Sequence, residues 1–272
     1  MLLTINNILF DKQQSSPLPA DNAVLSSLMR KYASADHRLF LLDYDGTIVP
    51  FQSNAEKAVP DKELIDIIHV LTSDQRNKVA IVSGRTRDFL EKCFADFKVI
   101  LVAEHGANIR YPDGEWMYPE DKTFPSKNII RRILLEICEE VPGSRVEEKD
   151  YSLVWHYRAA DADLSRDAAQ RLKARIYSEV QPDDVDIYDG NMIVEVRVPG
   201  INKGIAVTYL RVFTSYDFIF AAGDDRTDED MFYVLPDDAY SIKIGNEPTA
   251  AKYYVNTVAE LRRLISHIAV NS

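Results

Sequence analysis

Short apolar runs alternate with segments of helical periodicity over much of this chain. Before residue 113 the apolar runs lie at 39–42, 78–82 and 99–103, and each has the length of a buried strand. After residue 199 the alternation returns, with strand-like runs at 218–222 and 240–244. The intervening segments predict helices at 60–71 (opened by Pro60), 86–94, 203–213, 229–235 and 258–268. This alternation indicates an α/β fold with a doubly wound parallel sheet.

The pattern changes between residues 114 and 198. Ser126 is expected to cap a helix over 127–140. The inner face of that helix is expected to carry Ile129, Ile133, Leu134 and Ile137. Alternating segments at 145–149, 152–158, 185–188 and 192–198, with a second helix over 164–180, give the order α-β-β-α-β-β. Asp189-Gly190 predicts a hairpin turn, so we expect an inserted antiparallel sheet backed by two helices.

These patterns divide the chain into three parts. Residues 1–35 are expected to be an N-terminal leader, with a linker over 11–20 and a short helix capped by Asp21 or Asn22. Residues 36–113 and 199–272 form the predicted α/β core. Residues 114–198 form an inserted domain, with proline and glycine turn residues near both crossings.

Composition and charge exclude several classes of protein. The 272 residues are 46% hydrophobic and 28% charged, which is ordinary for a globular protein with a large core and a smaller second domain. The net charge of −11 argues against nucleic acid or an anionic membrane as a partner. No apolar run approaches the length of about 18 residues typical of a transmembrane helix, and residues 1–10 make a poor signal peptide. The separate Cys93 and Cys138 indicate neither a disulfide framework nor a metal site, so we expect a cytoplasmic protein.

The segment from Leu39 to Thr47 carries the first candidate chemistry. Its apolar run ends at Asp43, a second carboxylate follows at Asp45, and the chain turns at Gly46. An acid at the carboxyl end of a parallel strand lies where open α/β sheets bind ligands. Two such carboxylates cannot both be buried unpaired, and Mg²⁺, which prefers oxygen ligands, would compensate their charge. A strand that ends in an Asx turn is the plainer alternative for these residues alone.

Further polar residues fall at the ends of predicted strands or at helix starts. They are Thr47, Ser83, Lys203, Asp224, Asp225 and Asp228. Each has a plainer alternative, because a serine can cap a helix, a lysine can be solvated, and an acidic loop can cap the helix that follows. Their order and convergence on one sheet edge favour phosphoryl transfer through a covalent carboxyl phosphate.

This chemistry assigns a role to each side chain. Asp43 is the expected nucleophile, and Asp45 would protonate the leaving oxygen and later take a proton from water. Lys203 would supply positive charge, and Thr47 and Ser83 would bind phosphate oxygens. The expected ligands of Mg²⁺ are Asp43, Asp45 (through its backbone carbonyl), Asp224, Asp225 and Asp228.

Charged residues also lie on the alternating segments of the inserted domain. They are Lys149, His156, Arg158, Glu195 and Arg197. Carboxylates and cationic donors together suit a polyhydroxylated ligand, because each hydroxyl both donates and accepts a hydrogen bond. The alternative is that these residues form only the solvated face of the sheet.

Together the motifs resemble, in order, those of haloacid-dehalogenase-type phosphatases. They are Asp-Tyr-Asp-Gly-Thr at 43–47, Ser83, Lys203 and Gly-Asp-Asp-Arg-Thr-Asp-Glu-Asp at 223–230. Over about residues 36–270 the chain is similar to the trehalose-6-phosphate phosphatase family, as in Ser-Gly-Arg at 83–85, Ala-Glu-His-Gly at 103–106 and Val-Glu-Val-Arg at 194–197. The resemblance implies a Rossmann-like core with a parallel sheet, an inserted α+β cap of the C2 type, Mg²⁺, and hydrolysis of trehalose 6-phosphate.

The resemblance also implies contacts that the residue pattern alone does not. The substrate or its phosphate would be bound by Gly84, Arg85, Glu104 and His105 as well as by the residues named above. A trehalose-6-phosphate synthase, upstream in the same polypeptide or separate, is the implied protein partner. Asn191 stands where many members of the family carry a lysine, so one sugar contact of the family differs here.

The residues leave three functions open. The first is hydrolysis of trehalose 6-phosphate, and the second is hydrolysis of another sugar phosphate, such as sucrose phosphate, on the same architecture. The third is a non-catalytic domain that binds sugar phosphate or supports a synthase. No expected catalytic position is substituted, which weakens the third.

Overall fold

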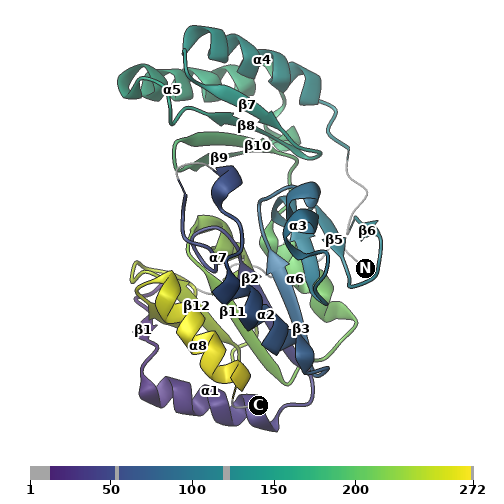
Figure 1. Cartoon of the computed structure of the whole chain (residues 1–272). Coiled ribbons are helices and arrows are strands. Elements are labelled where there is room, and N and C mark those ends of the chain that lie inside the picture. The colour runs from purple at the N-terminus through teal and green to yellow at the C-terminus, as the bar shows by residue number, and fades with distance from the viewer. Residues whose placement is uncertain (1–12, 53–54, 119–122, 271–272) are drawn as a thin grey trace. The chain divides into compact units, whose positions relative to one another are not determined.

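The computed structural model describes residues 13–52, 55–118 and 123–270 (Figure 1). The chain divides into two compact units, Met1–Pro119 with Asn202–Ser272, and Glu120–Ile201. We call the first the core unit and the second the insert unit. The predicted leader falls partly outside the described residues, which begin at residue 13.

The core unit contains a mixed sheet. Among the described residues, nine strands pair in the order β1-β13-β12-β11-β2-β3-β4-β5-β6. The pairs from β1 to β4 along this order are parallel, and β5 and β6 extend one edge with antiparallel pairs. Their bounds are β1 Leu18–Pro19, β2 Arg38–Asp43, β3 Asn77–Val82, β4 Ile100–Ala103, β5 Asn108–Arg110, β6 Trp116–Met117, β11 Phe218–Gly223, β12 Tyr240–Ile244 and β13 Tyr253–Val255. The predicted α/β fold with a parallel sheet is confirmed.

Helices cover both faces of this sheet. One face carries α1 Asn22–Ser34, α2 Lys62–Ser73, α3 Arg87–Phe94 and α8 Val258–Val270, with α2 and α8 in front of the strands in Figure 1. The other face carries α6 Lys203–Val212 and α7 Arg226–Tyr233. Strand β2 supplies both apolar layers, because Phe40 and Leu42 point to the first face and Leu39 and Leu41 to the second.

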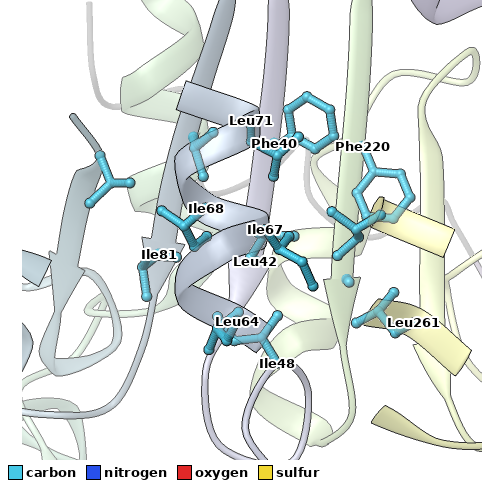
Figure 2. Close-up of a cluster of buried hydrophobic side chains, with 14 of the residues drawn as sticks. Phe40, Leu42, Ile48, Leu64, Ile67, Ile68, Leu71, Ile81, Phe220 and Leu261 are labelled. Carbon is cyan, nitrogen blue, oxygen red and sulfur yellow. The ribbon is translucent and has the colours of Figure 1, made fainter. Parts of the chain in front are cut away.

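Helix α2 illustrates how the sheet is held. Its apolar residues Leu64, Ile67, Ile68 and Leu71 recur at helical spacing and are buried against the first face (Figure 2). Burial of each such side chain stabilises the fold by roughly 1.5–3 kcal/mol. This packing fixes the carboxyl ends of the central strands, where the candidate site lies.

The insert unit is an antiparallel sheet backed by two helices. Within the described residues its four strands pair in the order β7-β8-β10-β9. The bounds are α4 Lys127–Glu140, β7 Arg145–Glu148, β8 Ser152–His156, α5 Ala162–Glu179, β9 Asp186–Gly190 and β10 Ile193–Arg197, with a short 3₁₀ turn at Pro182–Asp184. The core unit has two such turns, at Ala55–Lys57 and Glu104–Gly106 (η3). Its core contains Trp155, Val194 and Val196 from one face of the sheet. The order α-β-β-α-β-β is the predicted one.

Three details of the insert unit differ from the sequence prediction. Ile129 is exposed and Ile130 is buried, because the spacing of Ile130, Ile133 and Leu134 sets the inner face of α4. Ser126 precedes this helix without a side-chain capping bond. The hairpin turn lies at 191–192 rather than 189–190, since Gly190 still pairs with the first residue of β10 and Met192 takes the left-handed conformation, φ 62°.

Differences in the core unit follow from caps and short strands. Pro60 lies outside α2, because the side chain of Asp61 accepts from Leu64 N and caps the helix one residue later. Helix α7 begins at Arg226, earlier than predicted, because Asp225 and Asp228 form a capping box. Residues 18–19 of the predicted linker form β1. A strand as short as β1 gives too little periodicity to be recognised in a sequence.

Of the helices in the described residues, none combines the length and the hydrophobicity that crossing a bilayer requires.

Candidate active site

The carboxyl ends of three neighbouring strands bring several of the predicted residues together. Asp43 is the last residue of β2 and is buried. Ser83 follows β3, and Asp224 follows β11, and these two strands flank β2 in the sheet. The convergence follows from the fold, because parallel strands present their carboxyl ends at one edge of the sheet.

Lys203 joins this edge from the first turn of α6. Asn202 caps that helix, since its side chain accepts a hydrogen bond from Ile205 N. The Lys203 side chain is 2% exposed, and its Nζ donates to Asp43 Oδ1 at 2.6 Å and to Asp228 Oδ1 at 2.7 Å. Lys203 is therefore a buried partner of two carboxylates and not a solvated lysine.

Three carboxylates form the acidic part of the site. Within the parts of the chain that the structure describes, one oxygen each from Asp43, Asp224 and Asp228 lies within 4.8 Å of the others. Burial raises the pKa of Asp43 well above its usual range, and the negative charge of Asp228 adds to this effect while Lys203 opposes it. Burial, with Asp228 and Asp225 beside it, raises the pKa of Asp224 to about 7. A set of oxygen donors with excess negative charge fits a hard divalent cation.

Asp228 organises the loop between β11 and α7. Its carboxylate is fully buried, and Oδ2 accepts the backbone N–H groups of Asp224 at 2.9 Å and Asp225 at 3.0 Å. Asp225 in turn caps α7, because its side chain accepts from both the N–H and the hydroxyl of Thr227 at 2.7 Å. The capping alternative therefore describes the side chain of Asp225 in this structure, and its role as a metal ligand stays a prediction.

The turn after β2 packs closely against Asp224. Thr47 Oγ1 donates to Asp224 Oδ1 at 2.9 Å, so the hydroxyl predicted to bind phosphate here orients a carboxylate. Gly46 has φ 85°, and a Cβ at this position would lie 2.3 Å from Asp224 Oδ2. Only glycine fits there without displacing the carboxylate.

Asp45 lies outside the group of three carboxylates described above. Its two oxygens accept hydrogen bonds from Arg85, with Nε to Oδ2 at 2.6 Å and Nη2 to Oδ1 at 2.5 Å. Ser83 Oγ, which is buried, accepts from the backbone N–H of Arg85 at 3.1 Å. The structure thus joins the predicted proton-transfer residue to the loop after β3.

The turn after β4 supports the same loop through its backbone. Glu104 and His105 both have left-handed backbones, with φ 50° and φ 58°. Their N–H groups donate to Arg85 O at 3.0 Å and to Ser83 O at 2.9 Å. A Cβ at Gly84 would lie 2.3 Å from His105 Nε2, so the imidazole covers that glycine. Direct contact of these residues with a substrate stays a prediction.

The sequence prediction missed Lys243 at this site. The residue lies on β12 and is buried, and its Nζ donates to the carbonyl oxygen of Asp224 at 2.6 Å. It also lies 3.8 Å from Glu229 Oε1, and Glu229 accepts from Thr249 Oγ1 at 2.6 Å. A lysine near the carboxyl end of an otherwise strand-like run, at 240–244, is a signal that could have revealed it.

A second polar cluster lies on the sheet of the insert unit. Glu195 and Arg197 are 3% and 2% exposed, and Arg197 Nη2 donates to Glu195 Oε2 at 2.6 Å. Lys149 Nζ lies 3.6 Å from Glu195 Oε1, and the Arg197 guanidinium stacks 4.4 Å from the ring centre of Tyr188. Glu195 and Arg197 are therefore buried, whereas the alternative placed them on a solvated face of the sheet.

The other two predicted residues of the insert unit have separate partners. His156 Nε2 pairs with Glu147 Oε2 at 2.7 Å, and this contact lowers the pKa of Glu147 below its usual range. Arg158 Nη2 donates to Asn191 O at 2.9 Å, at the hairpin turn. The structure thus groups Lys149, Glu195 and Arg197 and leaves His156 and Arg158 outside that group.

Comparison with known proteins places this geometry in a family. The trehalose-phosphatase family model matches residues 41–259. The bifunctional trehalose-6-phosphate synthase/phosphatase of Thermoproteus tenax is 40% identical over 245 residues, which cover 90% of this chain and 33% of that protein. A trehalose-phosphatase of Schizosaccharomyces pombe is 37% identical over 233 residues, covering 79% of this chain and 28% of that protein. The chain thus spans about a third of the length of the curated relatives it matches.

Solved structures give the same result. The C-terminal domain of trehalose-6-phosphate phosphatase from C. albicans aligns with a TM-score of 0.83 and 29% identity, covering 94% of this chain and 99% of that one. A haloacid dehalogenase-like hydrolase from B. subtilis, 14% identical with a TM-score of 0.58, shares the fold over 85% of this chain and 98% of that one. The chain therefore belongs to the trehalose-phosphatase family, and its fold is that of haloacid dehalogenase-like hydrolases.

Proposed function

We propose that this chain hydrolyses trehalose 6-phosphate to trehalose and phosphate through a phosphoryl group carried on Asp43. The observation that carries the proposal is the buried contact of Lys203 with Asp43 and Asp228, at the strand edge that also holds Asp224. Membership of the trehalose-phosphatase family and the names of the relatives support the same substrate and reaction.

The proposed reaction has two half-reactions. In the first, an Asp43 carboxylate oxygen forms a bond to phosphorus, the bond between phosphorus and the sugar oxygen breaks, and a proton from Asp45 passes to that oxygen. In the second, water attacks phosphorus, its proton passes to Asp45, and the Asp43 carboxylate leaves. Lys203 holds Asp43 Oδ1 and thereby directs the carboxylate while partly offsetting its repulsion from phosphate. Ser83 is the proposed donor to a phosphate oxygen, and Thr47 would join it once its hydroxyl turns away from Asp224, with Gly84, Glu104 and His105 shaping the loop.

The family and the acidic cluster imply a divalent cation, and we propose Mg²⁺. Asp43 and Asp224, with the backbone carbonyl of Asp45, would hold it directly. Asp228 already accepts bonds on both oxygens, so its main proposed part is to position the loop. When bound, the cation supplies positive charge that offsets the repulsion between carboxylates and phosphate, on the order of 4 kcal/mol per pair at ~4 Å in a moderately polar site.

We propose that the insert unit is a cap that selects the sugar. Glu195 accepts from Arg197 and lies near Lys149, so its carboxylate is held in one orientation before any ligand arrives. A fixed carboxylate flanked by cations suits neighbouring hydroxyl groups, which both donate and accept. His156 and Arg158 are the proposed outer contacts.

The synthase link also belongs to the proposal. The T. tenax relative is named a bifunctional synthase/phosphatase, and a Dictyostelium discoideum relative is named a trehalose-phosphate synthase. We infer that a trehalose-6-phosphate synthase, in the same or a separate polypeptide, supplies the substrate.

Phosphate release from a panel of sugar phosphates tests the function. With Mg²⁺ present, trehalose 6-phosphate is expected to be cleaved far faster than glucose 6-phosphate, which lacks the second ring. Asp43→Asn, which replaces the nucleophile by an amide of the same shape, is expected to abolish turnover. Preference for sucrose phosphate would transfer the proposal to another disaccharide, and no hydrolysis of any ester would refute it.

A further inference from the structure

The side chain of Arg85 is more fully held than a flexible surface arginine. Its backbone N–H donates to Ser83 Oγ at 3.1 Å, and its carbonyl accepts from Glu104 N at 3.0 Å. The guanidinium lies over the ring of Phe89, 4.4 Å from its centre, and Phe89 packs edge-on against Tyr44 at 5.6 Å between ring centres. Two backbone bonds and one aromatic face therefore fix both ends of this residue.

The polar end of Arg85 is directed at Asp45. Nε and Nη2 donate to the two different carboxylate oxygens at 2.6 Å and 2.5 Å. A paired contact of this kind fixes the plane of the carboxylate as well as its distance, which a single ammonium cannot do. The Asp45 side chain is 28% exposed, so without such a contact it could take other rotamers.

We propose that Arg85 is the positioning residue of Asp45, acting on proton transfer to the leaving group rather than on the phosphate. The inference rests on the proposed phosphatase function and deepens it, because it assigns Arg85 a part other than the substrate contact implied by family resemblance. The edge of the guanidinium that carries Nε and Nη2 is already occupied by Asp45.

The step at issue is the first half-reaction. As the bond from Asp43 to phosphorus forms and the ester bond breaks, a proton moves from Asp45 to the sugar oxygen, leaving negative charge on Asp45. A carboxyl held in one plane can meet that oxygen in line, and the guanidinium stabilises the charge that develops. An ester whose leaving group departs as a stable anion needs no such proton.

Leaving groups of different basicity therefore test the inference. We would measure kcat/KM, which reports the steps up to loss of the leaving group, for wild type and Arg85→Gln. The substrates would be trehalose 6-phosphate, phenyl phosphate and 2,4-dinitrophenyl phosphate. For trehalose 6-phosphate the variant is expected to lose on the order of 10²-fold, the cost typical of a misplaced catalytic group. For the dinitrophenyl ester the loss should be within about threefold, because its anion leaves unaided.

Three further measurements separate positioning from structural damage and from phosphate binding. Arg85→Lys keeps the charge but lacks the paired donors, so it should remain at least about tenfold impaired on trehalose 6-phosphate. In single-turnover reactions, Arg85→Gln added to Asp45→Asn should change the rate by less than about threefold, because both act on the same step. The inhibition constant of inorganic phosphate should be unchanged in Arg85→Gln.

Arg76→Gln is the matched control. Arg76 also binds both oxygens of an aspartate, Asp74, but at the opposite end of β3. This variant should retain wild-type kcat/KM on all three esters.

Equal loss on all three esters, restored activity in Arg85→Lys, additive losses in the double variant, or a tenfold weaker phosphate inhibition would each overturn the inference. Failure of the proposed function looks different, because wild type itself would then cleave none of the esters.

Discussion

Replacement of Lys203 by methionine tests the electrostatic reasoning behind the site. Methionine has nearly the same length but no charge, so the change removes the ammonium that Asp43 and Asp228 share. We expect the variant to fold, to unfold more easily than wild type in a chelator, and to have no phosphatase activity.

The size of the effect follows from the two contacts. At 2.6 Å and 2.7 Å, and with an effective dielectric constant of about 20, each contributes roughly 6 kcal/mol of Coulomb attraction. Most of that attraction offsets the cost of removing three charged groups from water. Breaking a buried pair by removing one partner typically costs about 3–5 kcal/mol, because a buried charge is left uncompensated. We therefore expect the free energy of unfolding to fall by about that amount.

Stabilisation by a bound divalent cation should increase in the Lys203→Met variant, although its stability in chelator decreases. With all three carboxylates ionised, as a bound cation would keep them, they and the lysine carry a formal charge of −3 + 1 = −2, which the divalent cation neutralises. Without the lysine the charge is −3, so a cation should bind more tightly and raise the melting temperature by more than in wild type. Catalysis should still fail, because Asp43 is no longer directed by Lys203.

Thermal and urea unfolding, each with chelator and with Mg²⁺, would measure these effects. Lys62→Met is the control, because Lys62 forms an exposed pair with Asp66 whose loss should cost at most about 0.5 kcal/mol. The reasoning fails if Lys203→Met unfolds at the wild-type midpoint in chelator, or if Mg²⁺ stabilises it less than wild type.

Three further predictions concern pH, the cap and the metal. In chelator, the free energy of unfolding should decrease as pH rises from about 4 to 7, because folded Asp224, with a pKa of about 7, keeps a proton that the unfolded chain has lost. Asp224→Asn should flatten this dependence, and an unchanged slope would contradict the raised pKa of Asp224. Glu195→Ala should remove most of the preference for trehalose 6-phosphate while barely changing slow hydrolysis of p-nitrophenyl phosphate; equal loss of both would count against a cap that selects the sugar. Exhaustive chelation should abolish phosphate release, and added Mg²⁺ should restore it. Ca²⁺, with its larger and looser coordination shell, should inhibit phosphate release. Full activity without metal would rule out the proposed cofactor.

Much of the core could be predicted because its signals are local. A strand buried on both faces is a continuous apolar run, as at 39–42, and the apolar stripe of α2 recurs at helical spacing. The positions of Asp43 and Asp224 at strand ends follow directly from where these runs stop. The short strands β5 and β13 could not be predicted, because a few residues give no readable period and their pairing depends on a neighbour already in place.

Side-chain partners were less accessible to sequence reasoning. The acidic segment at 223–230 does not distinguish the roles of Asp225 and Asp228. In the structure Asp225 caps α7, whereas Asp228 is buried and accepts a hydrogen bond from Lys203. Ile129 and Ile130 are equally apolar, and only the packing of α4 decides which of them is buried. Lys243 was missed because its partners, the carbonyl of Asp224 and the carboxylate of Glu229, lie on another element, and the one local signal is a lysine at the end of a strand-like run.

The sequence by itself determined the alternation of strands and helices, the interruption by a second unit, and the acids and lysine of the candidate site. Those features depend on residue type and spacing along the chain, which can be read without coordinates. Only the tertiary structure decided that Lys203 contacts Asp43, 160 positions earlier in the chain, and that Arg85 is paired with Asp45. Such contacts arise because the parallel sheet brings distant strand ends to one edge, and because burial there makes an unpaired charge too costly to keep.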